Sequence, residues 1–114
     1  MIRVSDERFE ELVDAGLDRV PQELLDNLRN TVILVRDRDP RGLHILGLYE
    51  GVALTERTSD YSGHLPDTIS IYKDALENYC STEEELAEQV AITVVHEIGH
   101  HFGIDDARLH ELGY

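Results

Sequence analysis

Apolar side chains recur at helical spacing from the start of the chain. The spacing predicts a helix that Ser5 caps and that runs to about residue 20, with acidic residues between its apolar positions. Those apolar positions are Phe9, Leu12, Val13, Gly16 and Leu17. Pro21 suits the first turn of a second short helix, whose apolar residues are leucines. Both helices are expected to cover the core.

The longest apolar pattern begins after Ser81 and Thr82. Each hydroxyl has a glutamate three residues further on, as in a capping box, and acidic residues suit the positive end of a helix dipole. Apolar residues then recur at intervals of four, at Leu86, Val90, Val94 and Ile98. This pattern predicts a central buried helix that ends at Gly103, because glycine accepts the left-handed conformation of a helix end. A last short helix is expected over residues 105–112.

Between these helices the apolar residues form short runs, which are typical of β-strands. Residues 31–35 form a β-branched run and are predicted to be a buried strand. Residues 43–49 predict a second strand, residues 52–54 a short edge strand, and the alternating residues 68–72 a further strand. The polar residues 37–42 and 55–66 are predicted to be loops. Two helices, a small sheet and a long helix indicate an α+β domain that spans residues 1–114.

Composition and charge narrow the classes of function. The chain has 114 residues, of which 41% are hydrophobic, and this suits one globular domain with a modest core. Its net charge of −14 argues against binding to nucleic acid or to an anionic membrane surface. Cys80 is the only cysteine, so an internal disulfide is impossible. Because the first residues also lack the apolar run of a signal peptide, we expect a cytoplasmic protein.

The central helix carries the chemistry at its C-terminal end. His96-Glu97-Ile98-Gly99-His100 forms the pattern H-E-x-x-H. On a helix, a spacing of four turns the side chain by only about 40°, so both imidazoles lie on one face and can bind one metal ion. Glu97 would lie near the open coordination position and take a proton from water there. The structural alternative is a pair of hydrogen-bonded histidines beside the core.

A hydrolytic zinc site usually has three protein ligands and one water, so a third ligand is needed beyond the helix. Asp106 is the preferred candidate, because a turn at Gly103 would bring its carboxylate back toward the helix face. The alternatives left open are Asp105, which equally suits the cap of the final helix, and also His110 and Glu111.

Other polar side chains near the motif have less defined roles. His101 points about 100° away from His100 on a helix, so we expect it to pack or to form hydrogen bonds nearby. An oxyanion would need a separate donor, and the sequence offers His64, Tyr61 and Tyr114 without ranking them.

The residues support a comparison with known families. The spacing His96-Glu97-x-x-His100-x-x-Gly103-x-x-Asp106 resembles the extended zinc motif of the metzincin group, with aspartate in place of the third histidine. More closely, the chain resembles the small bacterial zincin-like metallopeptidases, which have a minimal zincin fold. The resemblance covers roughly residues 20–114 and includes residues 46–51, 65–67, 69–72 and 96–104.

This resemblance implies a short mixed sheet packed against the active-site helix. It also implies that His96, His100 and Asp106 bind Zn²⁺ and that Glu97 is the general base. The chain departs from true metzincins because its only methionine is Met1, so it lacks their downstream methionine turn. We also expect no second subdomain.

The expected function is therefore that of a zinc-dependent metallopeptidase. Its expected partner is a peptide or protein substrate. Short or extended segments, which can bind along a sheet edge, are favoured over folded proteins. Two alternatives remain: a non-catalytic metal-binding or protein-interaction module built on the same scaffold, and a metal-free helical interaction domain.

Overall fold

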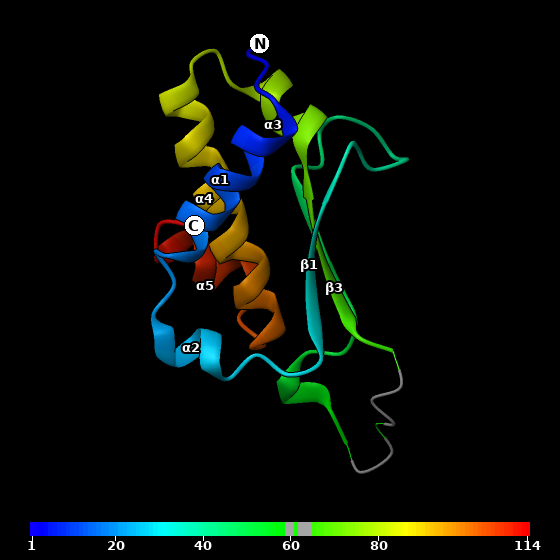
Figure 1. The fold of residues 1–114 in the computed structure, drawn as a ribbon. Coiled ribbons are helices and arrows are strands. Elements are labelled where there is room, and N and C mark those ends of the chain that lie inside the picture. The colour runs from blue at the N-terminus through cyan, green and yellow to red at the C-terminus, as the bar shows by residue number, and fades with distance from the viewer. Residues whose placement is uncertain (59–60, 62–64) are drawn as a thin grey trace.

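The computed structural model describes residues 1–58, 61 and 65–114. In these residues the helices lie on one side of a small β-sheet (Figure 1). In chain order the elements are α1 (Asp6–Leu17), α2 (Gln22–Asp26), β1 (Thr31–Arg36), β2 (Gly47–Glu50), the 3₁₀ helix η1 (Leu54–Glu56), β3 (Asp67–Tyr72), α3 (Lys73–Tyr79), α4 (Glu83–His101) and α5 (Asp106–Glu111). The predicted α+β class is confirmed.

The sheet is mixed, as the family resemblance implies, and its strand order is β1-β3-β2. β1 runs parallel to the central strand β3, with Thr31 opposite Asp67. β2 runs antiparallel to β3, with Gly47 opposite Ile71. Both β1 and β2 are therefore edge strands of the described sheet, and β2 is the edge strand that contacts α4.

Two strand predictions are wrong in part, and a third is wrong. β1 is not a buried strand, since Val32 is 40% exposed and Leu34 and Val35 are each 38% exposed. The reason is its position at an edge, where it has only one neighbouring strand. The second predicted strand begins four residues late, at Gly47. Residues 52–54 form no edge strand, because the chain turns away from the sheet after Gly51 and enters η1.

The core lies between the sheet and the helices. α4 contacts β2 and β3 on one side and α1 on another, so it occupies the centre of the domain (Figure 1). The fully buried residues include Phe9 of α1, Ile69 and Ile71 of β3, and Leu86, Val90 and Val94 of α4. This burial confirms the apolar patterns that predicted α1 and α4.

The predicted caps are also present. The Ser5 hydroxyl accepts the backbone N–H of Arg8, and the Thr82 hydroxyl accepts that of Glu85 at 3.1 Å. α3 was not predicted; it begins directly after β3 without a side-chain cap, so no local signal marks it. None of the helices in the described part of the chain has the length and apolar character needed to cross a membrane.

Candidate metal centre

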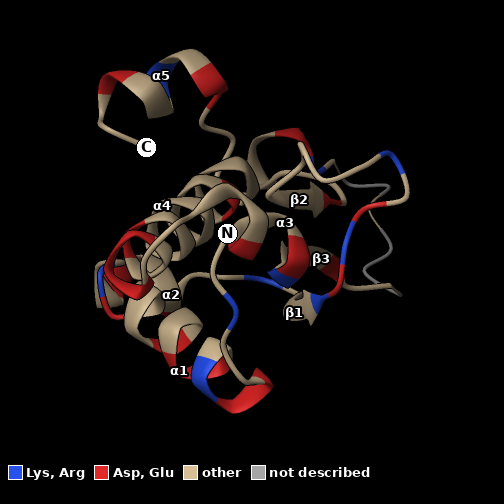
Figure 2. Ribbon diagram, turned by 90° about the horizontal axis from the view of Figure 1, so that it is seen from above, with Lys and Arg blue, Asp and Glu red and all other residues tan. Residues whose placement is uncertain are grey.

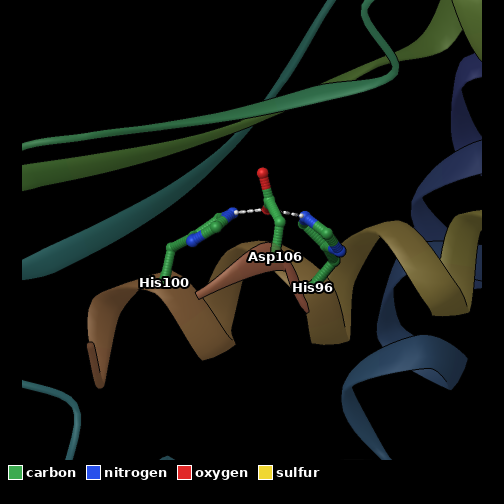
Figure 3. A group of neighbouring side chains, drawn as sticks. All are labelled: His96, His100 and Asp106. Atoms are coloured by element: carbon green, nitrogen blue, oxygen red, sulfur yellow. Dashed lines mark hydrogen bonds and ion pairs between the residues drawn. The ribbon is translucent and has the colours of Figure 1, made fainter. Parts of the chain in front are cut away.

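α4 places the two histidines of the motif on one face. His96 and His100 are half-buried, and their ring centroids are 4.8 Å apart with the ring planes at 79°. This arrangement follows from the spacing of four residues on a continuous helix. Both rings point to the same side of the helix, toward the segment that follows it (Figure 3).

The turn after α4 brings Asp106 to these rings. Gly103 has a φ of +83°, in the left-handed region predicted for it, and the backbone N–H of Ile104 donates to Gly99 O at 3.0 Å. The chain then reverses, and α5 begins at Asp106. Asp106 Oδ1 lies 3.0 Å from His96 Nε2 and 2.9 Å from His100 Nε2, so the carboxylate stands between the imidazoles (Figure 3).

The three side chains fit a divalent metal ion such as Zn²⁺. One ligand atom from each of them lies within 4.8 Å of the others. His96 Nδ1 is 3.1 Å from the backbone carbonyl oxygen of Tyr114, which can only accept, so Nδ1 carries the proton and donates it. Histidines that bind a metal ion through one ring nitrogen commonly donate a hydrogen bond from the other ring nitrogen. Two imidazole nitrogens and one carboxylate are the donor set of many hydrolytic zinc sites.

Glu97 lies beside this group and is nearly buried, with 8% of the residue exposed. Burial raises the pKa of its carboxyl, and the nearby Asp106 acts in the same direction, whereas His96, His100 and the backbone amide of Tyr49 oppose the rise. Glu97 and the three candidate ligands line the same cavity, of about 550 Å³. The site therefore joins a candidate metal group and a candidate base in one accessible space.

In the structure the alternative third ligands have other partners or lie outside the group of three. Asp105 caps α5 by accepting the backbone N–H of Arg108 at 2.9 Å, as its alternative role predicted. Glu111 pairs with the guanidinium of Arg108 at 3.0 Å. The ring of His110 lies 5.9 Å from that of His96, outside the group of three close ligand atoms. Asp106 is the candidate that the fold brings to both histidines.

The structure describes two of the three residues considered as oxyanion donors. The hydroxyl of Tyr61 accepts a hydrogen bond from the side chain of Asn30 at 3.0 Å, and its ring lies under Arg57. Tyr114 contacts His96 through its backbone carbonyl. His64 lies outside the described residues.

Sequence reasoning missed a buried polar group, which we call the Asp67 cluster: Asp67, Arg57, Tyr49 and His101. Arg57 donates to Asp67 at 2.6 Å, and the hydroxyl of Tyr49 donates to the same carboxylate. His101 Nδ1 lies 3.5 Å from Asp67, and His101 Nε2 accepts the backbone N–H of Arg29 at 3.2 Å. His101 thus forms hydrogen bonds beside the motif, as expected from its position on the helix.

The Asp67 cluster holds one wall of the cavity. Asp67 accepts the backbone N–H of Val52 at 3.3 Å, and Arg57 donates to Val52 O at 2.8 Å, which fixes the segment from Gly51 to η1. Burial raises the pKa of Asp67, but hydrogen bonds from Tyr49 and Arg57 outweigh this and leave the pKa below its ordinary value. No periodic pattern in the sequence indicates that this aspartate is buried.

Comparison with known proteins agrees with these features. The family model described as zincin-like metallopeptidase matches residues 26–114. A search of the curated proteins finds no match to the chain. The matched residues include the whole sheet, α4 and α5, and therefore every side chain of the candidate metal group. The match confirms the family resemblance, and the chain belongs to the zincin-like metallopeptidase family.

Proposed function

We propose that this protein is a zinc-dependent peptidase, in which His96, His100 and Asp106 hold the metal ion and Glu97 is the general base. The observation that carries the proposal is the approach of two imidazole nitrogens to one carboxylate oxygen, at 3.0 and 2.9 Å, beside a nearly buried glutamate. Membership of the family supports the class of a metal-dependent peptidase.

The residues of the site then have distinct roles. Bound zinc supplies a Lewis acid that polarises a carbonyl and makes water more acidic. Glu97 accepts a proton from the attacking water and passes it to the leaving amine. The Tyr114 carbonyl orients His96 through Nδ1 and so leaves Nε2 facing the other ligands. The Asp67 cluster keeps the opposite wall in place while substrate binds.

The free edge of β2 offers a place for the substrate backbone. Tyr72 N–H donates to Leu46 O at 3.0 Å, and the register places Gly47 opposite Ile71. In an antiparallel pair the hydrogen-bonded positions alternate, so the amides of Gly47 and Tyr49 face away from β3. The Tyr49 amide donates to Glu97, so the Gly47 amide is the donor that a substrate backbone would use. An extended peptide would add to this edge as a further strand.

Gly47 allows this strand to approach the active-site helix. A Cβ atom at this position would lie 2.6 Å from Thr93 Cγ2 and 3.3 Å from Glu97 Cγ. Any side chain would therefore push β2 away from α4 or displace Thr93, and it would crowd Glu97. The close approach supports a cleft in which a substrate paired with β2 has its scissile peptide bond near Glu97, the proposed base.

The test compares the zinc-loaded protein with its Glu97→Gln variant on a mixture of unstructured peptides. We expect the wild type to cleave some of them and the variant to lose at least about 100-fold in rate, as the loss of a general base does, while it retains one zinc per chain. Glu88→Gln, on an exposed position of α4, is the matched control and should keep the wild-type rate.

Undiminished turnover in Glu97→Gln would remove Glu97 as the base. A fully metallated wild type that cleaves no peptide would instead favour the non-catalytic metal-binding module.

A further inference from the structure

The cleft between β2 and α4 continues on both sides of Glu97. A first hollow, of about 550 Å³, lies on the side of His100 and Asp106. A second hollow, of about 290 Å³, extends from His96 toward the N-terminal half of α4. Gly47, His96 and Glu97 line both hollows, so the two meet at the proposed base. A peptide along β2 would place side chains from opposite sides of the scissile bond in different hollows.

The first hollow is acidic. Glu56 of η1 and Asp105, the cap of α5, line it in addition to Glu97 and Asp106. Both Glu56 and Asp105 are exposed, and none of the described residues that line this hollow is lysine or arginine. A divalent cation would offset the charges of Glu97 and Asp106, which leaves the two other carboxylates unbalanced. The first hollow is therefore suited to a cationic side chain.

The wider charge of the protein acts in the same direction. Acidic positions outnumber basic ones along α1 and α4 (Figure 2), and the net charge of the chain is −14. A field of this sign raises the local concentration of cationic peptides and speeds their approach. An acidic residue at the first hollow would be repelled both locally and at long range.

The second hollow has a different lining. Ile45 and Leu46, which lead into β2, and Ile92 of α4 supply its apolar surface. Apart from Glu97, its described lining residues include no carboxylate, lysine or arginine. His44, Gln89, Thr93 and His96 supply its other polar groups, so a charged side chain would find no ion-pair partner of its own beyond Glu97, whereas an apolar one would be favourably buried against the isoleucines and Leu46.

We propose that the cleft selects extended peptide segments that carry a cationic side chain on one side of the scissile bond and an apolar side chain on the other, with Glu56 and Ile92 as specificity-determining residues of the two hollows. This inference rests on the proposed function for the position of the scissile bond. The preference itself is a property of binding and can be measured without turnover.

The test measures peptide binding to the zinc-loaded Glu97→Gln protein by fluorescence anisotropy. Labelled peptides share one backbone and differ at the two central positions, which hold arginine and leucine, glutamate and leucine, or arginine and aspartate, each in both orders. In the preferred order, the arginine–leucine peptide should bind about tenfold more tightly than the glutamate–leucine peptide at low salt. High salt should largely remove this difference, because both carboxylates are exposed.

Two further variants, made in the Glu97→Gln background, assign the preference to residues. Glu56→Lys should abolish or reverse the preference for arginine over glutamate, whereas Glu10→Lys, with the same charge change on an exposed position of α1, should preserve it. Ile92→Thr should weaken binding of the leucine-containing peptides about threefold and leave the charge preference intact. Thermal melts monitored by circular dichroism confirm that each variant is folded.

Equal affinity for all peptides, or an arginine preference that Glu56→Lys leaves unchanged, would overturn the inference. Turnover by the wild type reports separately on the proposed function. Selective binding without any cleavage would support the cleft specificity and contradict the peptidase, while cleavage without selectivity would do the reverse.

Discussion

Asp67→Asn should destabilise the protein more than any change to an exposed ion pair. The variant keeps the size of the side chain but removes the charge that balances Arg57, whose guanidinium is 2.6 Å away and whose side chain is only 11% exposed. In asparagine a nitrogen replaces one of the two carboxylate oxygens, and this nitrogen cannot accept a hydrogen bond from Arg57. The guanidinium therefore stays buried with its main partner lost.

The size of the effect follows from this burial. Breaking a buried ion pair by removing one partner costs about 3–5 kcal/mol. At roughly 0.05–0.15 kcal/mol per residue, a chain of this length has a free energy of unfolding of about 6–17 kcal/mol. The variant would thus lose a large share of its stability, and its melting temperature should fall by about 12–20 °C.

Urea denaturation followed by circular dichroism measures the change in the free energy of unfolding. The m-value should be the same in the variant and the wild type. The double variant Asp67→Asn/Arg57→Met removes the unpaired charge and should recover part of the loss. Glu88→Gln breaks only the exposed pair with Arg19 and should have little effect. A loss below about 1 kcal/mol in Asp67→Asn would refute the argument that a buried charge pair holds this wall.

Three other outcomes are expected. Gly47→Ala should cost about 1–3 kcal/mol in urea denaturation, because its Cβ would lie 2.6 Å from Thr93 Cγ2; adding Thr93→Ser, which removes that methyl group, should recover part of the loss. Asp106→Asn should lower zinc affinity at least about tenfold in a chelator competition, whereas Asp105→Asn should leave that affinity unchanged. The pKa of Asp67 lies below its ordinary value of 3.8, so its charged form stabilises the fold above about pH 4 and this contribution is lost as the pH falls through the lowered pKa. In Asp67→Asn the free energy of unfolding should therefore fall less steeply as the pH drops below about 4. The same steepness in the variant and the wild type would contradict this prediction.

The sequence predicted the elements whose signals are local. α4 has a capping residue at Thr82, an apolar repeat of four and a glycine end, and each of these features is present in the structure. The position of β1 was not predictable in this way, because a β-branched run looks the same at an edge as in the middle of a sheet. α3 has no side-chain cap, so no residue in the sequence marks where it begins.

The same distinction applies to the site. The spacing of His96 and His100 on one helix is a local property, and Gly103 marks the turn that returns Asp106 to them. The Asp67 cluster depends instead on contacts between residues far apart in the chain, such as Asp67 with His101. No periodicity within a single element predicts such a contact, so this part of the cavity wall could not be predicted from the sequence.

The proposed function requires that His96, His100 and Asp106 hold one zinc ion beside Glu97 and leave it a position open to solvent. A crystal of the zinc-loaded protein, measured on both sides of the zinc absorption edge, would locate the ion. We expect one anomalous peak bounded by these three side chains, with no fourth protein ligand. A peak elsewhere, or a fourth protein ligand that closes the site, would contradict the proposed function.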